Sequence, residues 1–125
     1  MNLDDTANFA SVLLHSAATA HVLHFQLTGE GSDAAHRALQ AYYEQIPELV
    51  DGLTESIMGA YQTILPAYRG TFMNTNLTPL EYMLAIQDFV KQGRVNLPQD
   101  PEIQNEVDTI ANMVNRIVYR LTFLR

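Results

Sequence analysis

At 125 residues the chain has room for a single domain, residues 1–125, because two independent cores would not fit into this length. Apolar residues make up 47% of the chain, which is enough for one sizeable core, and acidic residues outnumber basic ones 14 to 7. The resulting net charge of −7 repels phosphate backbones, so DNA binding is not expected. The absence of cysteine excludes disulfides, thiolate zinc sites and cysteine nucleophiles. The acidic start is not a secretory signal, and a cytoplasmic protein is expected.

The first helix is predicted to run from Asp4 or Asp5 to Leu27, with its two acids at the positive end of the helix dipole. Helical periodicity predicts an apolar stripe made of Phe9, Leu13, Ala17, Ala20, His24 and Leu27. The opposite side is predicted to hold Asn8, Ser11, His15 and Gln26. The uncharged stretch from Thr6 to Gly29 is long enough to cross a bilayer. It contains many polar side chains and lacks a basic flank, so a buried helix explains it better and no membrane association is expected.

The second helix is predicted after a turn at Thr28–Gly31, because two glycines in three residues break a helix. Ser32 or Asp33 is the expected cap, and the helix is predicted to reach about Ile64. Its apolar face is predicted to comprise Leu39, Tyr43, Ile46, Val50, Leu53, Ile57 and Tyr61. Pro47 falls inside this pattern without ending it, so a kink near Tyr43 is expected and not a helix boundary.

Two shorter helices are predicted in the second half of the chain, after an irregular segment from Ala67 to Leu77. Thr78 and Glu81 form a capping box with Pro79 in the first turn, which predicts a helix that ends at Gly93. A second start signal at Asp100 and Pro101 predicts a last helix that reaches Phe123. No strand-like alternation of useful length occurs. The sequence therefore predicts an all-α four-helix bundle with two long N-terminal helices and two shorter C-terminal ones.

Side chains that bind metal ions are concentrated in the first two helices. All four histidines lie between positions 15 and 36, and the second helix carries an acidic stripe of Glu44, Glu48, Asp51 and Glu55. Like charges three or four residues apart repel each other, and a bound cation would turn that cost into an advantage. Imidazole and carboxylate ligands without thiolate suit iron, manganese or zinc.

Helix geometry limits which of these residues can share one ion within a chain. Along a helix, Asp51 lies about 22 Å from His36, and Glu55 lies about 28 Å from it. Metal ligands must lie about 2 Å from their common ion. His24 and His36 flank one turn and can meet within one chain, but the two acids cannot join them there. If all four bind one metal, two chains supply the ligands across a two-fold axis, which creates two equivalent sites.

This pattern resembles the Dps family (DNA-binding protein from starved cells) of ferritin-like proteins over roughly residues 10 to 60. The family motif has a histidine followed by an aromatic and an amide residue, a Thr-Gly pair, and a second histidine twelve positions on, as at His24 and His36. An Asp-x-x-x-Glu pair begins fifteen positions later, as at Asp51 and Glu55. His21 matches a further histidine that often lies three positions before the motif.

The resemblance implies a ferritin-like fold with a crossover between the two helix pairs, and a ferroxidase centre shared between subunits. His24 and His36 would come from one chain, and Asp51 and Glu55 from its neighbour, with Glu55 bridging or anchoring the iron. Family members oxidise Fe(II), often with peroxide, and store the ferric product inside a hollow shell. The expected function is therefore iron storage or peroxide detoxification under oxidative stress, with iron as the metal and zinc or manganese as alternatives. The expected partner is the chain itself, as a dimer at minimum and up to a cage.

The chain departs from the family pattern in several respects, including its short length and its short third helix. It has no lysine-rich tail, so DNA binding is not carried over. The small helix between the second and third long helices is reduced to Leu65–Leu77, which reaches at most about 43 Å and makes a crossover tight. Pro47 is not part of the family pattern and would tilt Asp51 and Glu55 relative to the partner's histidines.

Two other functions remain open. The chain could be a non-catalytic helical assembly or interaction protein that keeps the fold, although all four ligand positions are filled. It could also be a di-metal carboxylate enzyme of other chemistry, although the Glu-x-x-His pairs typical of such bundles are absent. His15 is expected to be exposed or capping, and His21 to support a ligand or simply to pack. A solvated face is expected for Glu44 and Glu48, and core or interface positions for Tyr42 and Tyr43.

Overall fold

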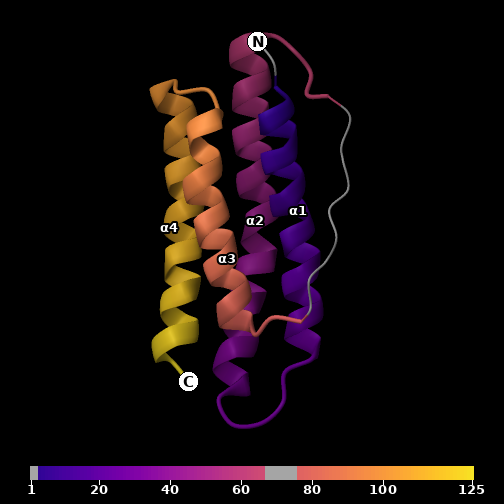
Figure 1. Cartoon of the computed structure of the whole chain (residues 1–125), viewed down its shortest axis with the longest axis vertical. Coiled ribbons are helices and arrows are strands. Elements are labelled where there is room, and N and C mark those ends of the chain that lie inside the picture. Colours follow the sequence, from indigo (N-terminus) through magenta and orange to yellow (C-terminus); the bar gives the residue numbers. More distant parts are fainter. Residues whose placement is uncertain (1–2, 67–75) are drawn as a thin grey trace.

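The computed structural model describes residues 3–66 and 76–125, and within these ranges the chain is helical and contains no strand. Four α-helices and a short 3-10 helix follow one another: α1 (Asp4–Phe25), α2 (Ser32–Tyr61), α3 (Pro79–Gly93), η1 (Arg94–Asn96) and α4 (Pro101–Phe123). The helices pack side by side as one bundle (Figure 1). The predicted all-α four-helix bundle is thereby confirmed, but the predicted lengths are wrong, because α4 with 23 residues is as long as α1 with 22. None of the helices described is long and apolar enough to cross a membrane.

The turn between α1 and α2 begins two residues earlier than predicted. Gly29 and Gly31 adopt left-handed conformations with φ of 88° and 80°, which residues with a Cβ rarely adopt. Gly31 is the residue that caps α2, without a side-chain hydrogen bond, so the predicted cap at Ser32 or Asp33 is wrong. Helix α1 ends at Phe25 and not at Leu27. The hairpin therefore brings the last turn of α1 directly beside the first turns of α2.

At its other end α2 stops at Tyr61, three residues before the predicted limit. Gln62 adopts a left-handed conformation with φ of 51°, and its N–H donates to the Met58 carbonyl, which closes the helix. Pro47 lies inside α2, and the helix continues on both sides of it, as predicted. The kink near Tyr43 stays a prediction.

The two helical hairpins are joined by one connection, from the end of α2 to the start of α3. The Tyr61 hydroxyl at the end of α2 donates to Asp100 Oδ1 at the start of α4. The start of α3, in contrast, shares a surface hollow with the α1–α2 turn and with Arg125 at the end of the chain. The end of α2 and the start of α3 therefore lie at opposite ends of the bundle (Figure 1). Most of the predicted irregular segment, residues 67–75, lies outside the described residues.

The core is formed by one face of each helix, and it corrects two sequence predictions. Tyr42 is fully buried, whereas Tyr43, which the periodicity had placed on the apolar face, is half-buried. Ser11 was predicted on the outer side of α1 but is fully buried. The Tyr42 hydroxyl lies 2.6 Å from Ser16 Oγ, which itself donates to the Leu13 carbonyl. Tyr42 therefore donates to Ser16, and this buried bond joins α1 to α2.

The start signals of α3 and α4 were correctly located. Thr78 Oγ1 accepts from the Glu81 N–H, and Glu81 Oε1 accepts from the Thr78 N–H, which completes the predicted capping box. Asp100 precedes the first residue of α4 as predicted, but its side chain makes no capping hydrogen bond. Its carboxylate accepts the Tyr61 hydroxyl instead, so it joins helix ends across the bundle.

Candidate metal centre

The hairpin turn brings two of the predicted ligands together. His24 lies in the last turn of α1 and His36 in the second turn of α2. Their Nε2 atoms are 2.8 Å apart, and the ring centroids are 3.7 Å apart. One Nε2 must carry the proton and donate to the other, because two unprotonated nitrogens cannot form this bond. The predicted meeting of His24 and His36 within one chain is thus what the structure contains.

The two rings differ in their surroundings. His24 is buried, with 7% of its surface exposed, whereas His36 is exposed. His24 Nδ1 has no hydrogen-bond partner within the described part of the chain. Burial lowers the pKa of His24, and the nearby rings of His36 and His21 lower it further. His24 is therefore held in the neutral form, which is the form that binds metal ions.

Aromatic rings surround His24 on the outer side of the hairpin. His21 stacks on Tyr43, with ring centroids 4.1 Å apart and an interplanar angle of 10°. His21 and Tyr43 both approach His24 edge-on, at centroid distances of 5.7 Å and 5.4 Å. Phe25, which is 73% exposed, stacks on His21 at 4.8 Å. These contacts limit how the His24 ring can turn.

Sequence reasoning did not assign Tyr43 and Phe25 to this site. Phe25 follows His24 directly, and Tyr43 lies two turns after His36, so their positions were compatible with contact. The stacking itself depends on the angle between α1 and α2, which periodicity does not specify. His21 packs against these rings; the sequence predicted that it would either support a ligand or pack.

The two predicted acidic ligands lie elsewhere. Asp51 and Glu55 are exposed on α2, far along the helix from His36. Among the residues that the structure describes, no group of three histidine or acidic side chains is placed to hold a metal ion. One chain therefore offers two imidazoles at one end and two carboxylates further along, and these sets do not meet within it. Glu44 and Glu48 are also exposed, as expected of a solvated face.

A shallow hollow of about 240 Å³ lies beside the histidine pair, and its lining includes His36, Leu27 and Asp33. Asp33 is the carboxylate of this hollow, but its Oδ2 pairs with Arg37 Nε at 3.1 Å. The surface next to His36 is thus open to solvent, to an ion or to another chain.

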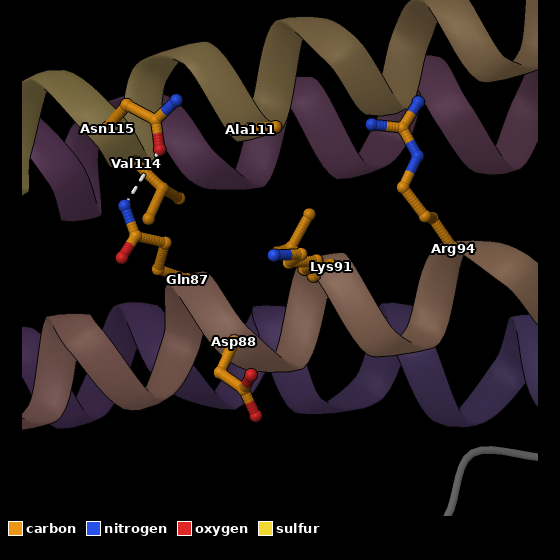
Figure 2. A pocket seen from close by; sticks show the side chains of 8 residues that line it. Gln87, Asp88, Lys91, Arg94, Ala111, Val114 and Asn115 are labelled. Atoms are coloured by element: carbon orange, nitrogen blue, oxygen red, sulfur yellow. Dashed lines mark hydrogen bonds between the residues drawn. The ribbon is translucent and has the colours of Figure 1, made fainter.

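A larger hollow of about 500 Å³ lies between α3 and α4, where Val90, Ala111 and Val114 provide apolar lining (Figure 2). Gln87 and Asn115 join the two helices at one end of it through a 2.9 Å hydrogen bond, and Arg94 lies at the other end. Arg94 is engaged by Asp108, at 2.6 Å, and by Gln104. This hollow contains none of the histidines and none of the predicted ligands.

Comparison with known proteins places the chain in a family without an assigned role. The sequence profile of DUF5856, described as a family of unknown function, matches residues 30–121, and the chain belongs to this family. The matched region contains His36, Asp51 and Glu55 but not His24.

One curated relative is the 4-hydroxy-tetrahydrodipicolinate synthase of Desulforamulus reducens, which is 26% identical over 99 residues. The match covers 79% of this chain but 33% of the synthase, so the chain spans about a third of the length of this relative. No solved structure matches the chain.

Proposed function

We propose that this member of the DUF5856 family is a Dps-like, ferritin-like protein that binds and oxidises Fe(II) at a site shared between two chains. The ligands would be His24 and His36 of one chain with Asp51 and Glu55 of another. Iron is the substrate of this site, and zinc or manganese would be bound by the same ligands.

The histidine pair is the observation that carries the proposal. Two nitrogens that bind one ion at adjacent positions, each about 2.1 Å from it, lie about 3 Å apart. The Nε2 atoms of His24 and His36 are already 2.8 Å apart, so little movement separates the hydrogen-bonded pair from a ligand pair. Metal binding would replace the shared proton, and the lowered pKa of His24 makes that exchange easier.

A second chain is needed because two imidazoles alone leave most of an ion's coordination unfilled. Asp51 and Glu55 are exposed and project from α2 one turn apart, as expected of side chains that bind an ion held by a neighbour. Carboxylates favour the ferric over the ferrous ion, because they are hard, negatively charged ligands. Two Fe(II) ions would give one electron each to hydrogen peroxide, which with two protons yields two molecules of water.

The chain connectivity supports the ferritin-like part of the proposal. Two antiparallel hairpins linked by one connection along the bundle are the arrangement of ferritin-like bundles. The bundle centre also argues against a di-metal site within one chain. Within residues 3–66 and 76–125, its polar groups include the hydroxyls of Tyr42 and Ser16, which bind each other, and not a cluster of carboxylates.

A non-catalytic assembly protein is the second candidate. The family match covers residues 30–121, a range that contains His36 but neither α1 nor His24. In that case the histidine pair would hold the hairpin together through its hydrogen bond and would not oxidise iron.

The test is Fe(II) oxidation by the metal-free protein with peroxide or oxygen, followed by the absorbance of the ferric product. The native chain should oxidise iron faster than buffer, and Asp51→Ala should not. Asp88→Ala is the matched control, because Asp88 is an exposed acid on α3 and lies away from the histidines. If native protein and Asp51→Ala both match buffer, the ferroxidase is refuted and the assembly protein is favoured.

Mixing two inactive variants tests whether the site is shared. One carries His24→Ala and His36→Ala, and the other carries Asp51→Ala and Glu55→Ala. Random exchange between such dimers restores about a quarter of the sites, because each mixed dimer combines one intact ligand set with one that lacks all four. An active native protein whose mixed variants stay inactive would place the site within one chain and would contradict the proposal.

A further inference from the structure

The outer surface formed by α2 and α4 carries charges of opposite sign at its two ends. Its acidic half consists of the exposed side chains Glu44, Glu48, Asp51 and Glu55 on α2. Its basic half consists of Arg37 on α2 with Arg116 and Arg120 on α4. We call this surface the charged face. It stands out because the chain has only seven basic residues, and three of them lie in this half.

The relative position of the two halves follows from how α2 and α4 are paired. The helices are antiparallel, and a Cβ added at Gly52 of α2 would lie 3.3 Å from Glu106 Oε2 of α4. Arg116 lies ten residues after Glu106, so it is level with Tyr42, ten residues before Gly52. Arg120 is likewise level with Ala38. Both arginines therefore lie nearer the His36 end of α2 than the acidic half does.

Both arginines are available for a partner. Arg120 lies fourteen residues from Glu106, close to four whole helical turns, so it shares the side of α4 that faces α2. Arg116 precedes it by about one turn and is exposed. Neither arginine forms an ion pair within the part of the chain that the structure describes. Arg37 pairs with Asp33, and both of these side chains are largely exposed, so solvent weakens that pair.

We propose that the charged face binds the same face of a second copy of the chain, turned by 180° so that each basic half meets the other's acidic half. A surface with opposite charges at its two ends is complementary to itself in this antiparallel arrangement and repels itself in the parallel one. Exposed aromatic side chains accompany the arginines: Tyr119 and Phe123 are 53% and 71% exposed, with ring centroids 5.6 Å apart. Arginine and aromatic side chains are enriched in protein interfaces.

The same two-fold arrangement also brings the two ligand sets of the shared site together, a point that rests on the proposed function. A two-fold axis that sets His36 against Asp51 of the second copy passes midway between them on α2, beside Tyr43 and Glu44. The same axis brings Arg116 level with Gln45 of the second copy, between its two glutamates at positions 44 and 48. Charge pairing on one side of the interface would thus hold the ligands in register on the other.

The test measures dimer dissociation of the full, metal-free chain by sedimentation equilibrium at low and high salt. Arg116→Glu with Arg120→Glu should weaken the dimer about tenfold or more, because each change acts twice across a two-fold axis. Added salt should weaken the native dimer as well. The single variant Arg116→Glu has Lys91→Glu as its matched control. Both change the net charge by the same amount, but Lys91 lines the α3–α4 hollow and is not part of the charged face.

A restoring variant separates pairing from net charge. Combining Arg116→Glu and Arg120→Glu with Glu44→Arg and Glu48→Arg keeps the net charge of −7 and exchanges the signs of the side chains that face each other across the proposed axis. It should dimerise close to the native level. A dimer insensitive to the arginine changes, a restoring variant that fails although its circular dichroism is native, or a metal-free chain that stays monomeric would each overturn the inference. A charge-dependent dimer that does not oxidise iron would refute the proposed function and leave this inference intact.

Discussion

The buried bond between Tyr42 and Ser16 gives a sharp test of the core, because an adjacent tyrosine serves as its control. Tyr42→Phe removes one hydroxyl from a fully buried ring, and Ser16 keeps its own bond to the Leu13 carbonyl. Tyr42→Phe should therefore lower the free energy of unfolding by about 1 kcal/mol, the contribution of one buried hydrogen bond. For a domain of this size that corresponds to a decrease in melting temperature of about 3–5 °C.

Tyr43→Phe makes the same chemical change on the neighbouring residue. Tyr43 is half-buried, and its hydroxyl has no hydrogen bond within the described residues, so this variant should unfold within about 0.5 kcal/mol of the native chain. Urea unfolding at one fixed protein concentration compares the two variants, because dimer formation would otherwise change the apparent stability. Adding Ser16→Ala to each variant completes a double-mutant cycle, in which Ser16 should couple to Tyr42 and not to Tyr43.

Equal losses for the two tyrosine variants would refute the reasoning, and so would a cycle without coupling to Tyr42. The same contact also predicts an alkaline limit. Burial raises the pKa of Tyr42 well above its usual value of 10.0, so the native state keeps this proton when the unfolded chain releases it. The stability that this group provides is complete below pH 10 and should be lost as the pH rises beyond it.

Three further outcomes follow from individual contacts. Gly93→Ala should lower the free energy of unfolding by about 1–3 kcal/mol in urea titrations, because its Cβ would lie 2.8 Å from the Phe9 ring. A Cβ added at Gly59 would have no atom within 4 Å, so Gly59→Ala should instead stabilise helix α2 by about 0.5–1 kcal/mol. Equal effects at both glycines would contradict this account. Thr78→Ala removes the capping box of α3 and should cost about 0.5–2 kcal/mol, whereas Thr78→Ser should retain most of it. Because the pKa of His24 is lowered in the folded chain, the unfolded chain binds a proton first as the pH falls, and the free energy of unfolding should decrease below about pH 6.5. His24→Phe should make the free energy of unfolding depend less on pH in this range. An unchanged pH dependence would assign the effect to other groups.

Local signals were enough to locate the two C-terminal helices. Thr78, Glu81 and Pro101 act within one turn of the chain, so their effect is visible in the sequence, and α3 and α4 begin where it predicts. The ends of α1 and α2 were less well predicted. The left-handed conformation of Gln62 ends α2 early, and Gln62 gives no sequence signal for it, whereas left-handed Gly31 starts α2 before the predicted cap.

Burial was harder to predict where two side chains competed for one face. The helical period favoured Tyr43 for the core, but Tyr42 lies opposite Ser16 and can bury its hydroxyl with a partner. These outcomes depend on the pairing of two helices and not on the pattern of one.

The candidate site was predictable to the extent that it is local. The turn length fixes that His24 and His36 meet, and the structure contains that contact. The relation of these histidines to Asp51 and Glu55 depends on a second chain, so it stays a prediction. The stacking of His21 on Tyr43 depends on how α1 and α2 cross, which sequence spacing leaves undefined.

The long connection between α2 and α3 also bears on how the molecule forms. Each hairpin, α1 with α2 and α3 with α4, consists of helices adjacent in the chain, so contacts within a hairpin close only short loops. Bringing the hairpins together closes one further loop, from Gln62 to Thr78, and the entropy cost of a loop grows only slowly with its length. Helical proteins dominated by such local contacts fold quickly. The proposed pairing of two chains would then require diffusion, so assembly should depend on concentration even where the folding of each chain does not.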